Sequence, residues 1–151
     1  EILPSDWSSD VCSSDLKAIE WMDLEALATR RLDQMSGGQR QRAFVAMVLA
    51  QDTPYVLLDE PLNNLDMTHA TQMMRRLRAA ADELGRTVVL VLHDVNYASV
   101  WADSILALRH GRVAAHGTPA QIMTTPVLEQ IYGQAITVRE FDGHRLALYY
   151  S

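Results

Sequence analysis

The 151-residue sequence has few cysteines, no long apolar run and few basic residues, and each of these excludes a class of protein. Its one cysteine, Cys12, cannot form an internal disulfide and makes a poor start for a metal site. Its apolar runs fall well short of the roughly 20 residues that a membrane-spanning helix requires. Acidic residues outnumber basic ones by 19 to 13, so we expect no general affinity for nucleic acid. These shortages favour a cytoplasmic protein.

The first sixteen residues, "EILPSDWSSDVCSSDL", differ from the rest of the chain. The triplet Ser-Ser-Asp occurs twice, at residues 8–10 and 13–15, and the stretch has neither helical nor strand periodicity. It is either a flexible linker or foreign sequence from a cloning or assembly junction, and we favour the junction. We therefore predict a non-native or disordered leader over residues 1–16 and a folded domain portion over residues 17–151.

Apolar strands alternate with helices through the middle of the chain. We expect one or two short helices within residues 17–32, a helix over about 38–51 and a buried strand at "YVLLDEP". A long helix over about 67–84, stopped by a glycine, then precedes an apolar strand over 87–92. This alternation predicts an α/β layered domain with a largely parallel sheet.

Shorter elements are expected in the last third of the chain. A helix is predicted over about 96–102, and the strands "SILAL" and "RVAAH" would meet around His110-Gly111. A helix opens at Thr118-Pro119, and the end of the chain alternates apolar and polar residues about Asp142-Gly143. Asp-Gly between alternating strands is a strong hairpin signal.

Polar side chains follow the two apolar strands where each strand ends. Asp59 and Glu60 end the first strand and His93 follows the second, at the edge where α/β sheets carry their working groups. Asp59 is suited to hold Mg²⁺ through water, because this ion prefers oxygen ligands. Glu60 could orient or deprotonate an attacking water, and His93 could donate a hydrogen bond to a terminal phosphate.

The stretch "MSGGQRQR", residues 35–42, places two glycines at the start of a predicted helix. Exposed N–H groups at a helix N-terminus bind anions, and Gly37 and Gly38 have no Cβ to keep a phosphate away. Ser36 adds a hydroxyl donor and a helix cap, and Gln39 adds an amide near the same turn. The stretch predicts a phosphate-binding turn.

Four motifs in order, "MSGGQRQR", "YVLLDEP", "NNLD" and "VLHD", resemble the second half of an ATP-binding cassette (ABC) transporter ATPase. The resemblance covers about residues 17–149 and implies a P-loop NTPase-like layered domain. It makes residues 35–39 the signature motif, Asp59 the end of the Walker B strand and Glu60 the catalytic glutamate. Asp66 then belongs to the D-loop, and His93 is the switch histidine.

The resemblance also implies how the site is assembled. Two cassettes stack head to tail, so the signature residues Ser36, Gly38 and Gln39 would contact the γ-phosphate of ATP bound to the other subunit. The residues at the strand ends would serve ATP and Mg²⁺ bound to their own subunit, and Asp66 would pass contacts between the two sites. The partners implied are a second, identical ATPase and transmembrane permease subunits, at the cytoplasmic face of the membrane.

The sequence departs from the family pattern in one respect. G-x-x-x-x-G-K-S/T, the loop that cradles the nucleotide phosphates, does not occur in these 151 residues. We therefore expect an incomplete cassette without its N-terminal Walker A half, which alone neither binds ATP tightly nor hydrolyses it. We also expect an uncovered apolar sheet face that promotes association.

The segment around Asn63-Asn64 looks most like the ATPases of iron–siderophore importers. One alternative is a non-transport ABC ATPase of DNA repair or translation, although such proteins tend to carry long coiled-coil insertions or tandem cassettes. A second alternative is an inert fragment that only pairs with an intact cassette. Binding to an intact ATPase subunit, and to a permease, would distinguish these readings.

Overall fold

The computed structural model describes residues 13–149, which form two compact units. The boundary falls between Val91 and Leu92, and each unit is described by itself below. Cys12 and residues 1–12 of the expected leader lie outside the described residues, as do residues 150–151.

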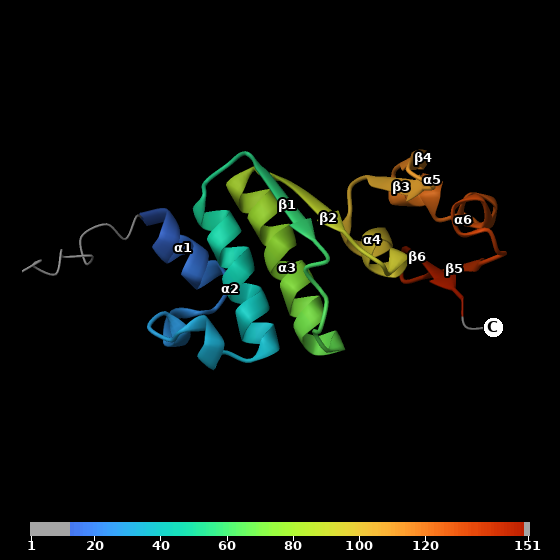
Figure 1. Cartoon of the computed structure of the whole chain (residues 1–151). Helices are drawn as coiled ribbons and strands as arrows, with labels where there is room; N and C mark the ends of the chain where they lie inside the picture. Colours follow the sequence, from blue (N-terminus) through green and yellow to red (C-terminus); the bar gives the residue numbers. More distant parts are fainter. Residues whose placement is uncertain (1–12, 150–151) are drawn as a thin grey trace, which may run out of the picture. The chain divides into compact units, whose positions relative to one another are not determined.

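The first unit packs its helices beside a pair of strands (Figure 1). Its elements are α1 (Ser13–Trp21), the 3₁₀ turns η1 (Glu25–Leu27) and η2 (Leu32–Gln34), α2 (Gly37–Ala50), β1 (Tyr55–Asp59), α3 (Met67–Leu84) and β2 (Thr87–Val91). The helices and strands expected between residues 38 and 92 are confirmed to within two residues at each end, but the first strand, expected to be buried, is exposed at three of its five residues. Helix α1 begins at Ser13, inside the stretch expected to be leader.

The strands β1 and β2 pair in parallel, from Tyr55 opposite Thr87 to Asp59 opposite Val91. Helix α2 contacts β1 and α3 contacts β2. Val56 is fully buried, whereas Leu57 on the opposite side of the strand is 69% exposed and its neighbour Val89 is 49% exposed. Parallel strands are normally covered on both faces, so this pair has one uncovered apolar face.

Helix α3 shows why the chain folds as it does here. Its buried residues recur every three or four positions, which gives one apolar stripe along the helix: Ala70, Met73, Met74, Leu77 and Ala80. Asp66 caps its start, and Gly85, in the left-handed region at φ 61°, ends it. The sequence pattern therefore fixes both the face and the length of this helix.

Two arginines hold the helix ends of the first unit together. Arg86 donates to the carbonyl of Leu49 in the last turn of α2, at 2.9 Å, and forms an ion pair with Asp52. A cation at a helix C-terminus is favourable because unpaired carbonyls gather there. Arg76 likewise donates to the carbonyl of Trp21 at 2.8 Å, at the end of α1.

The second unit contains two antiparallel hairpins and three short helices in its described part. Its elements are α4 (Val95–Trp101), β3 (Ile105–Arg109), β4 (Arg112–Gly117), α5 (Pro119–Ile122), α6 (Thr125–Tyr132), β5 (Thr137–Phe141) and β6 (His144–Leu148). The hairpins turn at His110-Gly111 and Asp142-Gly143, where all four residues have positive φ. That is the conformation of a type I′ turn, and both expected hairpins are confirmed.

The core of the second unit joins its last hairpin to its helices. The buried cluster consists of Met123, Leu128, Ile136 and Ala147. Asn96 on α4 binds the backbone of Ala147 twice, accepting from its N–H at 2.7 Å and donating to its carbonyl at 3.1 Å. The Asn96 side chain therefore makes the two hydrogen bonds to Ala147 that a neighbouring strand would otherwise make to β6.

The described strands differ from the expected sheet. Only β1 and β2 pair in parallel, while β3 with β4 and β5 with β6 are antiparallel pairs. The difference follows from the connections, since a two-residue turn reverses the chain and only a crossover such as α3 lets the next strand run parallel. Among the described helices, none is both long and apolar enough to cross a membrane.

Candidate functional site

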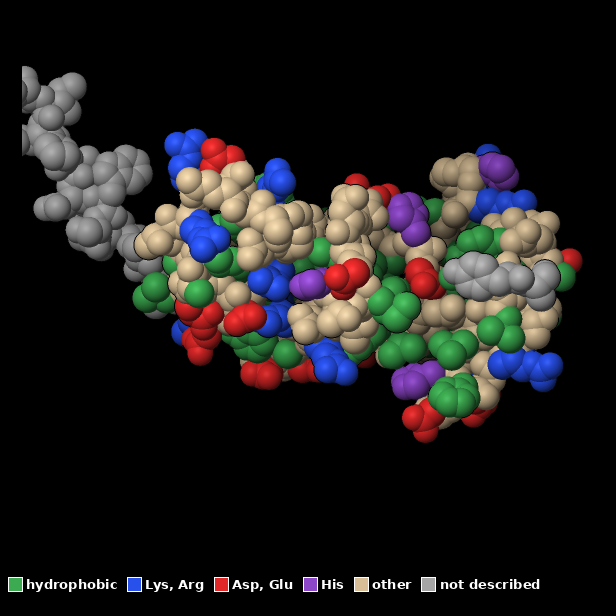
Figure 2. All heavy atoms as spheres, turned by 90° about the horizontal axis from the view of Figure 1, so that it is seen from below, with side chains coloured by type: hydrophobic (Ala, Val, Ile, Leu, Met, Phe, Trp, Pro, Cys, Tyr) green, Lys and Arg blue, Asp and Glu red, His purple; other side chains and the backbone are tan. Residues whose placement is uncertain are grey.

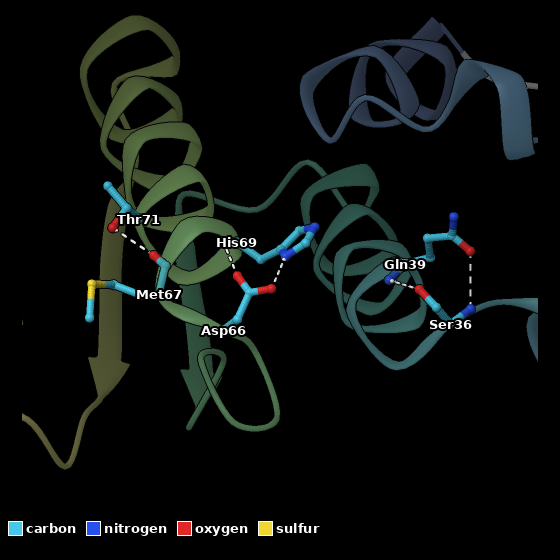
Figure 3. Close-up of polar contacts among 6 residues, drawn as sticks. All are labelled: Ser36, Gln39, Asp66, Met67, His69 and Thr71. Atoms are coloured by element: carbon cyan, nitrogen blue, oxygen red, sulfur yellow. Dashed lines mark hydrogen bonds and ion pairs between the residues drawn. The ribbon is translucent and has the colours of Figure 1, made fainter.

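The predicted signature turn, residues 36–39, begins with Ser36, which caps α2 (Figure 3). The hydroxyl oxygen of Ser36 accepts the backbone N–H of Gln39 at 3.3 Å, and the side-chain carbonyl of Gln39 accepts the N–H of Ser36 at 3.0 Å. This reciprocal capping box fixes the turn without a ligand. The two predicted residues are therefore held together, at the start of the predicted helix.

The capping box uses only acceptor atoms of the two side chains. The hydroxyl proton of Ser36 and the amide NH₂ of Gln39 take no part in it. The N–H groups of Gly37 and Gly38 lie in the first turn of α2, where helix geometry provides no intrahelical acceptor. A Cβ placed on Gly37 would meet nothing within 4 Å, so an anion can approach this turn closely.

At the end of β1, Asp59 is exposed and Glu60 has the left-handed φ of 49°, which is unusual for this residue type. Three contacts hold Glu60 there. Its N–H donates to the carbonyl of Val91 at 3.1 Å, and its own carbonyl accepts the N–H of Asn63 at 3.1 Å. The amide of Asn63 also donates to the Glu60 carboxylate. The predicted catalytic glutamate is thus fixed in a turn by its neighbours.

Asp66, which the resemblance assigns to the D-loop, caps α3 (Figure 3). One carboxylate oxygen accepts the N–H of His69 at 2.9 Å, and the other lies 2.8 Å from Nδ1 of the same residue. These contacts, the backbone N–H first and the imidazole second, lower the pKa of Asp66 below its ordinary value of 3.8. Asp66 is therefore ionised near neutral pH.

His93 belongs to the second unit, whereas all the other predicted site residues lie in the first. It follows β2 and immediately precedes Asp94, which caps α4 by accepting the N–H of Asn96 at 2.8 Å. Its side chain is exposed. The sequence expectation that His93 follows a strand end is confirmed, and its role stays a prediction.

Sequence reasoning missed two side chains of the first unit: Asn63, which binds Glu60, and His69, which binds Asp66. A signal for His69 was available. It stands three residues after a helix-capping aspartate, at the position from which side chains often reach back to the cap. No comparable spacing rule indicates that Asn63 would turn toward Glu60.

Metal ligands, cavities and basic surfaces elsewhere in the described chain also bear on its function. Residues 13–149 contain no group of three or more histidine, cysteine, aspartate or glutamate side chains that could hold a metal ion. A cavity of about 140 Å³ lies beside α1, between Lys17, Trp21 and Arg86, and includes none of the predicted site residues. On the face of the first unit seen in Figure 2, basic side chains are interspersed with acidic ones, and no continuous basic surface forms there.

Comparison with known proteins agrees with the motifs. A sequence profile described as ABC transporter matches residues 11–63. The chain is 50% identical over 135 residues to YclP of Bacillus subtilis, a petrobactin import ATP-binding protein, covering 89% of this chain and 54% of YclP. The chain belongs to the ABC transporter ATPase family. The profile begins inside the expected leader, and the leader boundary stays a prediction.

Other family members show the same partial match. The ferric enterobactin transport ATP-binding protein FepC of Escherichia coli is 42% identical over 127 residues, covering 84% of this chain and 47% of FepC. The chain thus spans about half the length of the curated relatives it matches. The fold resembles an ABC transporter assigned to the metal-chelate type, at TM-score 0.79 and 26% identity, over 91% of this chain and 57% of that one.

Proposed function

We propose that this chain is part of the ATP-binding and ATP-hydrolysing subunit of an ABC importer for an iron–siderophore complex. In this proposal its signature turn binds the γ-phosphate of ATP held by a second cassette. The observation that carries the proposal is the start of α2, where a capping box fixes a turn of four residues and leaves several of their donor groups unused.

The signature turn suits the end of a nucleotide triphosphate. The γ-phosphate carries its charge on several oxygens that can each accept hydrogen bonds. The turn offers the Ser36 hydroxyl, the Gln39 amide and the N–H groups of Gly37 and Gly38, at a helix end equivalent to about half a positive charge. Since the capping box already orders these groups, binding would require little rearrangement.

The strand-end residues suit the other half of an ATP site. Asp59 supplies the exposed carboxylate oxygens that Mg²⁺ prefers, and Mg²⁺ bound there would neutralise charge on the phosphates. Glu60 is held in one backbone conformation, from which it could orient or deprotonate the attacking water. His93 would donate a hydrogen bond to the terminal phosphate.

The nature of the cargo and the partners rests on relatives. YclP is named for petrobactin import and FepC for ferric enterobactin transport, which supports an iron–siderophore cargo for this chain. The bacterial cassette MJ0796, at 34% identity and TM-score 0.63 over 70% of this chain and 46% of that one, is dimeric. We infer a pair of identical ATPase subunits attached to transmembrane permeases at the cytoplasmic face of the membrane.

The proposal can be tested by complementation. YclP whose own signature serine is replaced by alanine would be mixed with this 151-residue chain, and phosphate release from Mg-ATP would be measured. We expect the chain to restore turnover, because it provides an intact signature turn to ATP bound by YclP. The matched control is the Ser36→Ala chain, which should restore none.

The same mixture separates the alternative functions. Restored turnover that increases further when the YclP permease subunits are added supports an importer ATPase. Restored turnover that is the same with and without the permease subunits favours a non-transport ATPase. Binding to YclP with no turnover favours a fragment that only pairs, and no binding in the presence of ATP would contradict the proposed function.

A further inference from the structure

His69 lies within hydrogen-bond distance of both carboxylate oxygens of Asp66, the predicted D-loop aspartate. The backbone N–H of His69 donates to one oxygen of Asp66, and the imidazole Nδ1 lies within hydrogen-bond distance of the other. Figure 3 shows the carboxylate of Asp66 between these two groups at the start of α3. The backbone bond alone would satisfy the helix cap, so the imidazole contact is additional to capping.

The direction of the second hydrogen bond follows from the charge of Asp66. An ionised carboxylate can only accept hydrogen bonds, so Nδ1 of His69 must carry the proton that joins them. Two anchors from one residue prevent the carboxylate from rotating about its own side-chain bonds. A single anchor at the backbone N–H would leave the second oxygen free to turn.

The pair is also accessible from outside the unit. The side chain of Asp66 is 65% exposed and that of His69 is 50% exposed, so a docking protein surface could reach both. Met67, the residue after Asp66, is also 81% exposed. The ordered carboxylate therefore lies on a surface that a partner could contact.

We propose that His69 is a positioning residue for Asp66, and that its imidazole sets the carboxylate in the orientation that a second cassette meets when the two pair over ATP. This inference rests on the proposed function, because it assumes that pairing occurs. It adds a residue outside the recognised motifs, and its contribution is the orientation of the D-loop carboxylate before the partner arrives.

Three variants of the 151-residue chain separate positioning from capping. H69A removes the imidazole and retains the backbone N–H, and alanine is a better helix former than histidine. H69N places a side-chain amide close to the position of Nδ1 and so retains a donor. T71V is the matched control, because it removes a different first-turn hydrogen bond, from the Thr71 hydroxyl to the Met67 carbonyl at 2.9 Å.

The first measurement is the pKa of Asp66 in each chain, from the pH dependence of its carboxyl carbon NMR signal without nucleotide. We expect the pKa of Asp66 to rise toward its ordinary value in H69A and to stay low in H69N and T71V. An unchanged pKa of Asp66 in H69A would overturn the inference, because the imidazole would then not hold the carboxylate.

The second measurement is ATP-dependent binding of each chain to intact YclP. We expect H69A to bind about two- to fivefold more weakly, the size expected for one exposed charged contact, and H69N and T71V to bind like the original chain. Binding of H69A equal to the original would overturn the inference, as would equal weakening in T71V. If the original chain itself does not bind, the proposed pairing fails, and the pKa of Asp66 still decides whether His69 holds the carboxylate.

Discussion

Leu65 packs against the first turn of α2 at Gly38. A Cβ built on Gly38 would lie 3.3 Å from Cδ2 of Leu65, which is closer than ordinary van der Waals contact. The two residues belong to different predicted motifs, the signature turn and the D-loop, and the structure brings these segments into contact within one unit. Glycine at position 38 therefore lets the side chain of Leu65 lie close to the turn.

Replacing Gly38 tests its contact with Leu65. G38A should weaken ATP-dependent binding to YclP, because its Cβ would press on the Leu65 side chain and displace the turn. The double variant G38A/L65A removes this packing conflict and leaves the Cβ in place. We expect the double variant to recover binding, as measured by analytical ultracentrifugation. A double variant that binds no better than G38A would contradict this reason for the glycine.

Replacing Ser36 separates stability from phosphate binding. S36A removes the helix cap and should lower the free energy of unfolding by about 1 kcal/mol in urea titrations. S36D retains a capping oxygen, so its stability should remain close to that of the original chain. Its negative charge would repel a phosphate, and we expect no ATP-dependent binding to YclP. An S36D chain that still binds would argue against phosphate contact at this turn.

The lowered pKa of Asp66 predicts how stability depends on pH. A carboxyl whose pKa is lower in the folded chain stabilises it above the unfolded pKa, and this contribution is lost as the pH falls through the folded value. D66N retains a capping oxygen without the charge. The urea midpoint of the original chain should exceed that of D66N near neutral pH, and the difference should shrink below pH 3.8. A difference between the two urea midpoints that does not change with pH would contradict the stabilising role of the Asp66 charge.

The uncovered face of β1 and β2 predicts self-association of the isolated chain. Leu57 and Val89 are neighbours on this face and both are exposed. The double variant L57S/V89S should remain monomeric at concentrations where the original chain associates, because it removes apolar surface from the face. Sedimentation velocity over a concentration series would show this. A monomeric original chain with a sharp, cooperative melt would count against it.

The Asn96 bridge predicts a large loss of stability in the second unit. N96A leaves the N–H and carbonyl of Ala147, a residue that is 2% exposed, without their side-chain partner. Each unsatisfied buried group costs about 1–3 kcal/mol. V113S, which changes an exposed side chain of β4, is the control and should cost little. The free energies of unfolding, measured in urea, would compare the two.

Local sequence patterns predict several elements of this structure. The apolar stripe and caps of α3 specify its ends, and Asp-Gly at 142–143 specifies a hairpin. The motif around Ser36 predicts the helix cap, because the cap depends on residues within one turn.

Other features depend on contacts that no local pattern encodes. The approach of Leu65 to Gly38 joins segments 27 positions apart, and the bridge from Asn96 to Ala147 joins segments 51 apart. The left-handed conformation of Glu60 has no sequence signal, since glutamate rarely adopts it and the surrounding turn imposes it. These features require the folded chain, and they include the contacts around the proposed catalytic glutamate.

The most direct test of the central claim is the affinity of this chain for intact YclP with and without Mg-ATP, measured by analytical ultracentrifugation alongside S36D. If the signature turn binds the γ-phosphate of ATP held by another cassette, the original chain will bind YclP only when ATP is present, and S36D will not bind in either condition. Binding that is independent of ATP, or that S36D retains, would contradict the account.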